Sequence, residues 1–380
     1  MKINIQVEVN KMMYSTLEYQ LRFFLPDLKQ ISFEKNNLEL TFKSSSTITE
    51  KYVRKLVSNL IEKFSNVPLV NTKNVDYDIS VLGEDEDLIR KYIKDFKNEV
   101  GKLSGLKISE YCTGLNLYKD ELVNLFIQLD LLLIKLYKSL YDSKLIRPNS
   151  LLSTQDAYKA GYYSNGCQHL SFVSNLSHEF EEFENTIKEI NSYSKVINKE
   201  QYSDSKYILN PALCVHCYPL LEEMGTNLGS SIFFTVLGKC FREESGNLNN
   251  KERLYEFQMG ELVYIGDSKR INQLRDEWCA ILGVFGEELG LDFKLETAND
   301  IFFDEFSTEK VFSQRVQDSK VEMNVYIPTL KKYISIGSVN FHKNHFTKEY
   351  DIKNENNNLE SMCLAIGYDR LLLSLIEETK

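Results

Sequence analysis

Two strand-like segments joined by a long polar loop constrain the fold more than any other part of this sequence. Residues 237–244 read LGKCFREE and residues 254–265 read LYEFQMGELVYI, and the loop between them is rich in Asn and Gly. Strand-forming residues on either side of such a loop are typical of two strands that pair with each other. The pattern therefore predicts a long-looped β-hairpin.

The rest of the chain has the composition of an ordinary soluble protein. Of its 380 residues, 43% are hydrophobic and 26% are charged, which suits one large domain or two with a substantial core. The most apolar stretch, residues 125–140, is interrupted by Gln128, Asp130 and Lys135, so it predicts a buried helix and no membrane span. The first nine residues alternate like a strand and lack a signal peptide's apolar block. Seven scattered cysteines, an odd number, favour a reducing, cytoplasmic location over a disulfide framework.

The charge distribution argues against broad attraction to nucleic acid. The formal net charge is −10, from 45 basic and 55 acidic residues. Residues 1–110 are almost neutral, with 17 basic against 16 acidic side chains, and the remainder holds 28 against 39. Nonspecific binding to nucleic acid depends on neutralising phosphates, so this balance does not favour it.

Three regions of the chain differ in pattern. Residues 1–110 predict a small α+β domain without a cluster of residues that suggests catalysis, so an accessory or acceptor-docking role is expected. Residues 111–150 contain a strongly apolar helical stretch and predict a helical connector. Residues 151–380 mix short strands, helices and aromatic-rich loops, and they carry the residues that suggest chemistry.

The predicted hairpin carries side chains suited to a phosphorylated ligand. Arg242 and Glu244 follow the first strand, Arg253 opens the return strand, and Phe257 lies four residues further on. A planar guanidinium can bind a phosphate through two hydrogen bonds, and an aromatic face can stack on a base. Taken alone, the spacing fits a surface hairpin with ion pairs slightly better.

The C-terminal segment changes that balance. Residues 359–370, LESMCLAIGYDR, predict a strand followed directly by a helix, with Gly367 at the junction and Arg370 in the first turn. Together, the Phe-Arg-x-Glu hairpin and this Gly-x-x-Arg junction resemble motifs 2 and 3 of class II aminoacyl-tRNA synthetases. The resemblance implies an α+β fold, in which helices flank a class II synthetase-type antiparallel β-sheet and a smaller α+β domain precedes it. It also implies a homodimer.

The resemblance implies a role in ATP binding for five residues. Arg242 would hold the α-phosphate and the charge that develops at the reacting carboxyl group. Glu244 would contact the adenine amino group, and Phe257 would stack on one face of the adenine. Arg370 would cover the other face and touch the γ-phosphate, while Arg253 would reach the β- and γ-phosphates. The resemblance assigns catalytic roles to Arg242, Glu244 and Arg370. The two arginines suit such a role because attack on ATP needs fixed cations around a polyanion.

Three further matches imply a zinc site. The segment 211–219 (PALCVHCYP), Glu261 and Cys363 resemble the Cys–Glu–Cys zinc ligands of the atypical, methanogen-type seryl-tRNA synthetases and of the amino acid:[carrier protein] ligases. Cys214 is preferred as the first ligand because the resemblance implies a ligand three residues after the proline, which is Pro211 here. Cys217 stays open as an alternative, both cysteines also fit a buried core, and His216 is a weaker candidate.

Other segments resemble the seryl-type core as well. In the strand pair expected at residues 321–328 and 333–341, Glu322 would receive the amino end of the substrate. Ile334 stands where ordinary synthetases place a metal-binding carboxylate, so the number of magnesium ions stays open. Residues 296–303 and 338–346 resemble the ligases especially. The histidines are expected to be structural, since an ionised carboxylate needs no general base; they are His169, His342 and His345.

The resemblance implies an ATP-dependent ligase with Zn²⁺, and with Mg²⁺ accompanying ATP. It would activate a small amino acid as an aminoacyl-adenylate and transfer it to the phosphopantetheine thiol of a carrier protein. The acidic chain and the lack of a recognisable coiled-coil arm favour the carrier protein over tRNA. A seryl-type tRNA synthetase and a catalytically silent paralogue with a regulatory binding role are the alternatives.

Overall fold

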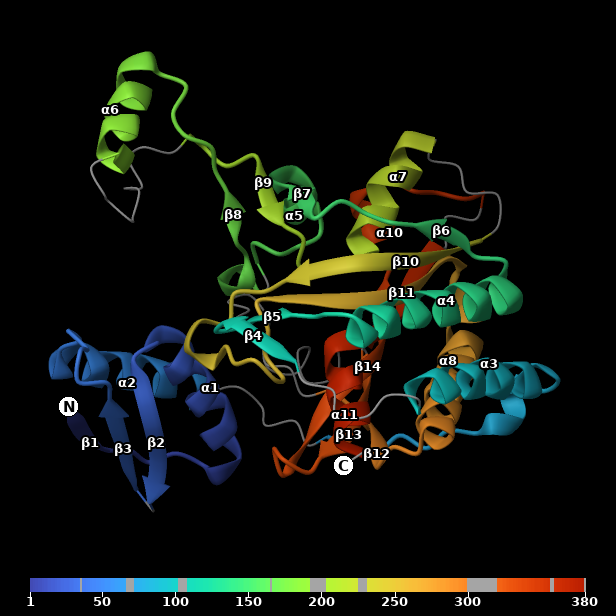
Figure 1. Cartoon of the computed structure of the whole chain (residues 1–380), viewed down its shortest axis with the longest axis horizontal. Coiled ribbons are helices and arrows are strands. Elements are labelled where there is room, and N and C mark those ends of the chain that lie inside the picture. Colours follow the sequence, from blue (N-terminus) through green and yellow to red (C-terminus); the bar gives the residue numbers. More distant parts are fainter. Residues whose placement is uncertain are drawn as a thin grey trace.

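Two β-sheets, each with its own hydrophobic core, organise the fold (Figure 1). The structure is a computed structural model. It describes residues 1–34, 36–65, 72–101, 108–164, 166–191, 203–224, 231–298, 320–355 and 359–378.

The smaller sheet is formed by residues near the N-terminus and has the antiparallel order β1–β3–β2. Its elements are β1 (Lys2–Gln6), α1 (Tyr14–Phe24), β2 (Leu28–Glu34), β3 (Asn37–Phe42) and α2 (Glu50–Ser65). Ile3 and Ile5 alternate with exposed polar residues and point to the core, because successive side chains of a strand face opposite sides. Leu17, Leu21 and Val53 close this core from the two helices.

The larger sheet has the order β12–β13–β14–β15–β11–β10–β6. Its strands are β6 (Lys144–Ile146), β10 (Ile232–Phe241), β11 (Glu256–Asp267), β12 (Phe293–Thr297), β13 (Lys320–Ile327), β14 (Lys332–Lys343) and β15 (Leu359–Gly367). Every neighbouring pair is antiparallel except β10 and β6, which run parallel. The predicted α+β class with an antiparallel sheet is confirmed.

One face of the larger sheet is covered by long helices (Figure 1). They are α4 (Glu121–Tyr141), α8 (Ile271–Leu289) and α11 (Tyr368–Glu378). The predicted buried helix corresponds to α4, and Trp278 of α8 is fully buried, as its helical apolar spacing predicts. Gly283 lets α8 approach a neighbouring segment closely, because a Cβ atom there would lie 2.2 Å from the ring of Tyr77.

The segment between the two sheets packs on the larger one. The backbone of Val75 donates a hydrogen bond to Leu295 of β12, at 2.9 Å. Helix α3 (Asp85–Val100) then lies against α4 and α8 and buries Ile89, Ile93, Phe96 and Val100 in the same core as the long helices. These residues therefore stabilise the larger unit, although they precede residue 110.

The other face of the larger sheet carries shorter elements. These are α5 (Thr154–Lys159), α7 (Cys217–Met224), α10 (His345–Glu349) and the small sheet of β7 (Leu151–Ser153), β8 (Phe172–Val173) and β9 (Tyr207–Leu209). A second core lies beneath them and includes Cys214, Cys217, Tyr218 and Cys363.

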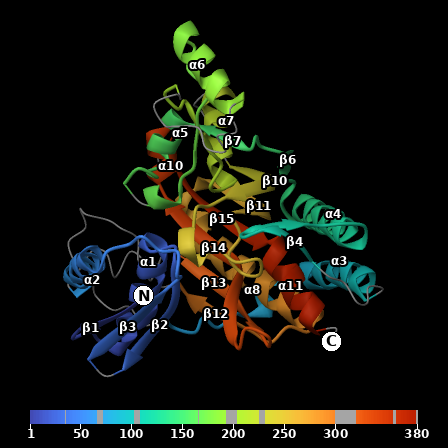
Figure 2. The same ribbon diagram turned by 60° about the vertical axis from the view of Figure 1, so that its left-hand side comes forward.

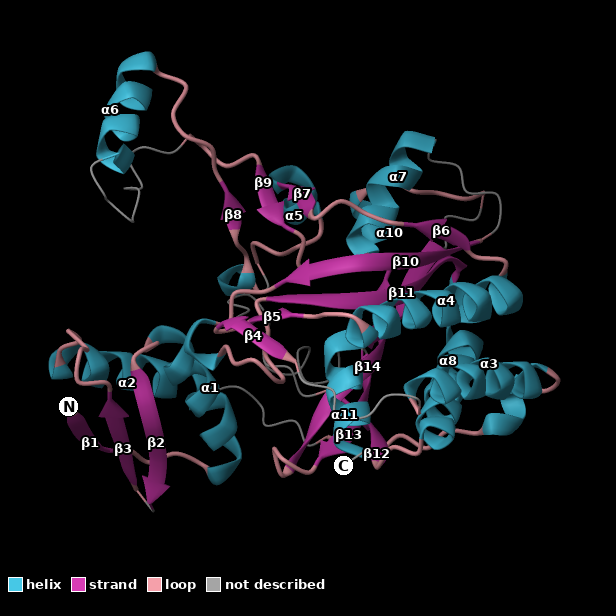
Figure 3. Cartoon of the chain, in the orientation of Figure 1, coloured by secondary structure: helices cyan, strands magenta, loops and turns pink. Residues whose placement is uncertain are grey.

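Two elements lie outside these layers. The β4 (Ser109–Cys112) and β5 (Leu115–Leu117) hairpin lies beside the loop that joins β10 to β11. Helix α6 (Phe180–Asn191) extends away from both sheets (Figures 1 and 2). Figure 3 shows that strands form the centre of the larger unit and helices its flanks. Among the described residues, no helix combines the length and apolarity needed to cross a bilayer.

Candidate active site

The hairpin predicted from residues 237–266 is present, and its loop begins the candidate site. Strands β10 and β11 pair from Ile232↔Ile265 to Phe241↔Glu256, so Arg242 and Glu244 follow directly after the last paired residue. Phe257 is paired with Cys240, one step before that end. The register therefore gathers Arg242, Glu244 and Phe257 at one end of the sheet.

Glu244 is an ionised acceptor in a nearly enclosed position. It is 9% exposed, and its Oε2 atom accepts hydrogen bonds from the Tyr19 hydroxyl at 2.7 Å and from Arg253 Nη1 at 2.9 Å. Burial acts to raise the pKa of Glu244, but Arg253 and the hydrogen bond from Tyr19 outweigh it and hold the pKa below its ordinary value. The carboxylate can therefore accept a further bond from an amino group.

Arg242 connects the hairpin to the segment that carries Cys214. Its Cζ atom lies 5.3 Å from the centre of the Phe257 ring, within cation–π range. Its Nε atom donates a hydrogen bond to the carbonyl oxygen of Pro211 at 3.2 Å. Its charge also reaches Glu261, where it favours the ionised carboxylate. Arg242 thus links the end of the hairpin to the segment that carries Cys214.

The strand–helix junction at Gly367 brings a third arginine to the loop. Strand β15 ends at Gly367, and Arg370 lies in the first turn of α11. Arg370 Nε donates to the Glu252 carbonyl at 2.7 Å, and its Nη1 donates to the Ser335 carbonyl at 2.9 Å. Burial, and then the nearby Arg253, lower the pKa of Arg370, which stays charged because its ordinary pKa is above 12. The two predicted motifs therefore meet in space.

Three possible metal ligands converge, and one of them, Cys214, belongs to the segment that Arg242 contacts. One ligand atom each from Cys214, His342 and Cys363 lies within 4.8 Å of the other two. Among the described residues of the 211–219 segment, Cys214 alone joins this group, and Cys217 and His216 do not. The two thiols are almost fully buried, whereas His342 is partly exposed.

The two thiols and Glu261 form a buried group in which the pKa of each residue depends on at least one of the others. A hydrogen bond between Cys214 and Cys363 raises the pKa of Cys214 and lowers the pKa of Cys363, so Cys363 is the better thiolate. Glu261 is 2% exposed and hydrogen-bonds with Cys214, although it lies outside the group of three. Burial, and then Cys363, raise the pKa of Glu261 to about 8.

The donor set fits a zinc ion. The buried Oε2 atom of Glu261 has no hydrogen-bond partner among the described residues, and an unsatisfied buried oxygen is costly. Thiolate, imidazole and carboxylate are the side chains that bind zinc in proteins. A cation at this position would supply the missing partner of Glu261 and stabilise both sulfur atoms.

His342 lies among the possible metal ligands, whereas the sequence analysis expected it to be structural. The pairing of β14 with β15 skips it, between Phe341↔Met362 and Lys343↔Ser361, so it occupies a β-bulge of the kind that re-aims a side chain. Its Nδ1 atom lies 3.1 Å from the Tyr218 hydroxyl, which itself donates to Ser361. Nδ1–H is therefore the donor to Tyr218, and Nε2, 3.6 Å from Cys363 Sγ, presents its lone pair. Polar and apolar residues alternate along 338–342, and this pattern in the sequence already placed His342 on the same strand face as Ser338 and Asn340.

Glu322 shares the face of Glu261 but lies far from the thiols. It is paired with Ser338, which is paired with Ala365, which is paired with Glu261. Residues paired across a sheet share one face, and the three strand spacings amount to roughly 14 Å. Glu322 is ion-paired with Lys320 at 2.6 Å. Its role at the substrate's amino end stays a prediction.

Two other segments from the sequence analysis need separate mention. Ile334, which stands where ordinary synthetases place a metal-binding carboxylate, is buried in the core beneath the long helices. The segment 296–303 is described only to residue 298, and its remainder lies outside the described residues.

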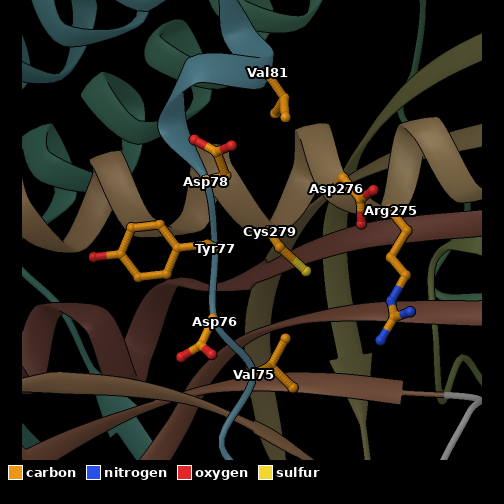
Figure 4. Close-up of a pocket in the computed structure, with 8 residues that line it drawn as sticks. All are labelled: Val75, Asp76, Tyr77, Asp78, Val81, Arg275, Asp276 and Cys279. Atoms are coloured by element: carbon orange, nitrogen blue, oxygen red, sulfur yellow. The ribbon is translucent and has the colours of Figure 1, made fainter.

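A shallow pocket lies elsewhere on the protein (Figure 4). It is lined by α8 and by the segment that leads to α3, and it shares no residue with the predicted site. The charged side chains of Asp76, Asp78, Arg275 and Asp276 spread apart and do not meet at one point (Figure 4). This pocket therefore does not resemble a catalytic centre.

The sequence of this region also matches a known protein family. Residues 195–379 match the tRNA synthetase class II core domain (G, H, P, S and T). This part of the chain is therefore similar to a class II aminoacyl-tRNA synthetase core domain, as the two motifs predicted.

Two groups of curated proteins are similar to this chain. The amino acid–[acyl-carrier-protein] ligases 1 and 2 of Bradyrhizobium diazoefficiens are each 29% identical, over 46% of this chain and 53% and 52% of their own lengths. The type-2 serine–tRNA ligase of Methanothermobacter thermautotrophicus is 26% identical over 56% of this chain and 42% of its own length. The match thus spans about half the length of these relatives.

Solved structures show the same fold. The seryl-tRNA synthetase of M. kandleri, determined in complex with A. aeolicus tRNASec, has a TM-score of 0.61 at 20% identity, over 99% of this chain and 74% of that one. The cytoplasmic serine–tRNA ligase of Naegleria fowleri, determined in complex with AMP, has a TM-score of 0.53 at 12% identity, over 75% of this chain and 61% of that one.

Proposed function

We propose that this protein activates a small amino acid with ATP and transfers it to the phosphopantetheine thiol of a carrier protein. The observation that carries the proposal is the convergence of three arginines, Glu244 and Phe257 beside a buried group of zinc-type ligands. Cations arranged around one point suit a polyanion such as ATP with Mg²⁺, and the metal-type ligands suit a free amino group.

In the first step, a carboxylate oxygen of the amino acid attacks the α-phosphorus of ATP. The bond from that phosphorus to the bridging oxygen breaks, and pyrophosphate leaves with the electron pair. Arg242 stabilises the charge at the α-phosphoryl group, and Arg253 and Arg370 neutralise the outer phosphates. The carboxylate is already ionised at neutral pH, so no side chain has to remove a proton.

In the second step, the carrier's thiolate attacks the carbonyl carbon of the aminoacyl-adenylate. The bond to the phosphate oxygen breaks, AMP leaves, and a thioester forms. Cys214, Glu261 and Cys363 would hold zinc, and three protein ligands leave one of its four positions open; His342 is the alternative to Glu261 as the third ligand. The bound ion supplies a Lewis-acid position that holds a neutral α-amino group.

The ligase relatives and the charge balance support a carrier protein as the acceptor. A tRNA needs several Lys or Arg contacts, whereas residues 1–110 are almost neutral and the remainder is acidic. Aminoacylation of tRNA is the second candidate. It is favoured by the serine–tRNA ligase relatives and by the M. kandleri seryl-tRNA synthetase, whose likeness in fold spans 99% of this chain.

ATP–pyrophosphate exchange, measured over the twenty amino acids, tests the first step. We expect exchange with one or a few small amino acids, and a loss of two orders of magnitude or more in Arg242→Ala. Arg242→Lys keeps a charge and serves as the matched variant. A wild-type protein without exchange for any amino acid would favour the silent paralogue.

The acceptor is tested with the radiolabelled amino acid that supports exchange. We expect label on a holo-carrier protein and none on total tRNA or on the apo-carrier, which lacks the thiol arm. Labelling of tRNA without labelling of any holo-carrier would establish the synthetase alternative instead.

A further inference from the structure

The N-terminal unit reaches the candidate nucleotide site through one tyrosine. Tyr19 of α1 donates its hydroxyl to Glu244 Oε2 at 2.7 Å, across 225 residues of sequence. Arg253 lies over the ring of the same tyrosine, with its Cζ atom 4.8 Å from the ring centre. Tyr19 therefore touches two of the predicted ATP-binding side chains at once.

The backbone of α1 is also pressed against the hairpin loop. Asn247 Nδ2 donates to the Tyr19 carbonyl at 3.0 Å. A Cβ atom added to Gly246 would lie 2.2 Å from the Arg22 carbonyl and 3.0 Å from Pro26. At this position glycine is required by the close approach of α1, because its φ lies outside the left-handed region.

A second element holds the loop further along. Asn250 Nδ2 donates to the carbonyls of Cys112 at 2.8 Å and Leu115 at 3.1 Å, both in the β4–β5 hairpin. The backbone of Tyr255 donates to Gly114 at 2.8 Å. The loop between β10 and β11 is thus held by two elements that precede residue 120 in the sequence.

We propose that Tyr19 is a positioning residue, through which helix α1 orients Glu244 and Arg253 for binding the adenine and phosphates of ATP. This rests on the proposed function, in which Glu244 accepts the adenine amino group. The N-terminal unit would then serve the adenylation step as well as any docking of the acceptor.

The pattern of bonds favours positioning over obstruction. Tyr19 and Arg253 both bond to Oε2 of Glu244, so Oε1 is left to accept a bond from a base. A buried carboxylate is held in one orientation only when hydrogen-bond donors fix it. A precise contact between Glu244 and the adenine amino group needs such support. Removing the hydroxyl should leave the ion pair in place but let the carboxylate rotate.

The test compares Tyr19→Phe with Tyr52→Phe in the full-length protein. Tyr52 belongs to α2 of the same unit and is 47% exposed, so its variant controls for loss of a hydroxyl there. For Tyr19→Phe we expect the KM for ATP in pyrophosphate exchange to rise about 5- to 10-fold, with kcat within about twofold. Discrimination of ATP from GTP should fall by a similar factor. An unchanged KM would overturn the proposal, and a lower KM would show that Tyr19 obstructs the site.

A second measurement keeps this inference separate from the proposed function. Hydrogen exchange of residues 245–249 is compared in the wild type, Tyr19→Phe, Gly246→Ala and Tyr52→Phe, without any substrate. We expect faster exchange in Tyr19→Phe and Gly246→Ala and no change in Tyr52→Phe. If the wild type shows no pyrophosphate exchange, the proposed function fails, and this measurement alone decides whether α1 holds the loop. Unchanged hydrogen exchange in both Tyr19→Phe and Gly246→Ala would overturn the inference.

Discussion

The carboxyl group of Asp369, in the first turn of α11, bonds both to Tyr118 and to strand β11. Tyr118 donates its hydroxyl to Oδ1 at 2.5 Å, and the backbone of Gln258 on β11 donates to Oδ2 at 2.7 Å. The side chain is 5% exposed, and burial raises its pKa to about 6. Arg370 is the next residue, so this carboxyl group also supports the turn that presents the arginine.

Asp369→Asn tests this assignment through the pH dependence of stability. An unfolded Asp has a pKa of about 3.9, so the raised native pKa means that protonation favours the folded state. The stabilisation is fully present below about pH 4 and is lost as the pH rises through about 6. Between pH 4.5 and 7.5 we expect the free energy of unfolding of the wild type, relative to Asp369→Asn, to fall by about 2 kcal/mol. Urea unfolding at several pH values measures the difference, and a constant difference would contradict the assignment.

His342→Gln tests the part of His342 in metal binding. Its Nε2 atom faces Cys363, so the variant should bind zinc at least tenfold more weakly, and Cys363→Ser should lose most of the metal. His345→Gln is the matched control, because His345 is exposed on α10, three residues away. Metal content after dialysis against a weak chelator gives the answer without an activity assay. Equal zinc retention in His342→Gln and His345→Gln would remove His342 from the site.

Helix α3 packs with the larger unit, although the sequence analysis placed it in a small domain of residues 1–110. Its apolar residues lie in the core of the larger unit, and the segment before it pairs with β12. The core of the N-terminal unit, by contrast, is made of residues 3–61. We propose that the N-terminal unit ends near residue 65. A deletion of residues 1–110 would then also remove part of the larger core and would not isolate one domain.

Ile93→Ala tests this placement of α3. Ile93 is fully buried, so removing its side chain should lower the free energy of unfolding by about 2–5 kcal/mol and destabilise the larger unit. Lys91→Ala, on the exposed side of the same helix, should change it by less than about 0.5 kcal/mol. Hydrogen exchange should then rise in α4 and α8 but not in β1–β3. Loss of protection confined to β1–β3 would place α3 with the N-terminal unit.

At the scale of the whole molecule, an exposed apolar stripe marks a candidate contact between two copies. Val123, Ile127 and Leu131 follow at four-residue spacing on α4 and are 40–51% exposed, and Leu145 of the edge strand β6 is 57% exposed. Residues four apart share one face of a helix, so the stripe is continuous. We propose that a second copy covers it, which agrees with the homodimer that the class II resemblance implies.

Ile127→Lys tests the dimer. A charge at the middle of a covered apolar stripe should shift the protein from twice 44.2 kDa to the monomer mass in sedimentation. Val81→Lys, at an exposed valine outside the stripe, should leave the assembly unchanged. A wild type that sediments as a monomer would contradict this proposal, whatever the variant does.

Local patterns in the sequence determined the elements and the kind of site. Strand alternation and turn residues predicted the hairpin, and Gly367 with Arg370 predicted the strand–helix junction, because these features depend on neighbouring residues. The class II resemblance was carried by the same local segments. The same resemblance favoured Cys214 over Cys217, and in the structure Cys214 lies near His342 and Cys363.

Only the tertiary structure decided which distant side chains meet. The bulge at His342, the wide separation of Glu322 from Glu261 and the packing of α3 all depend on strand register and on helices that cross the sheet. Tyr19 and Glu244 are 225 residues apart, and nothing in either local sequence indicates their contact. Such pairs form because strand register and the packing of whole elements place distant segments side by side, and both depend on the whole chain and not on any short segment.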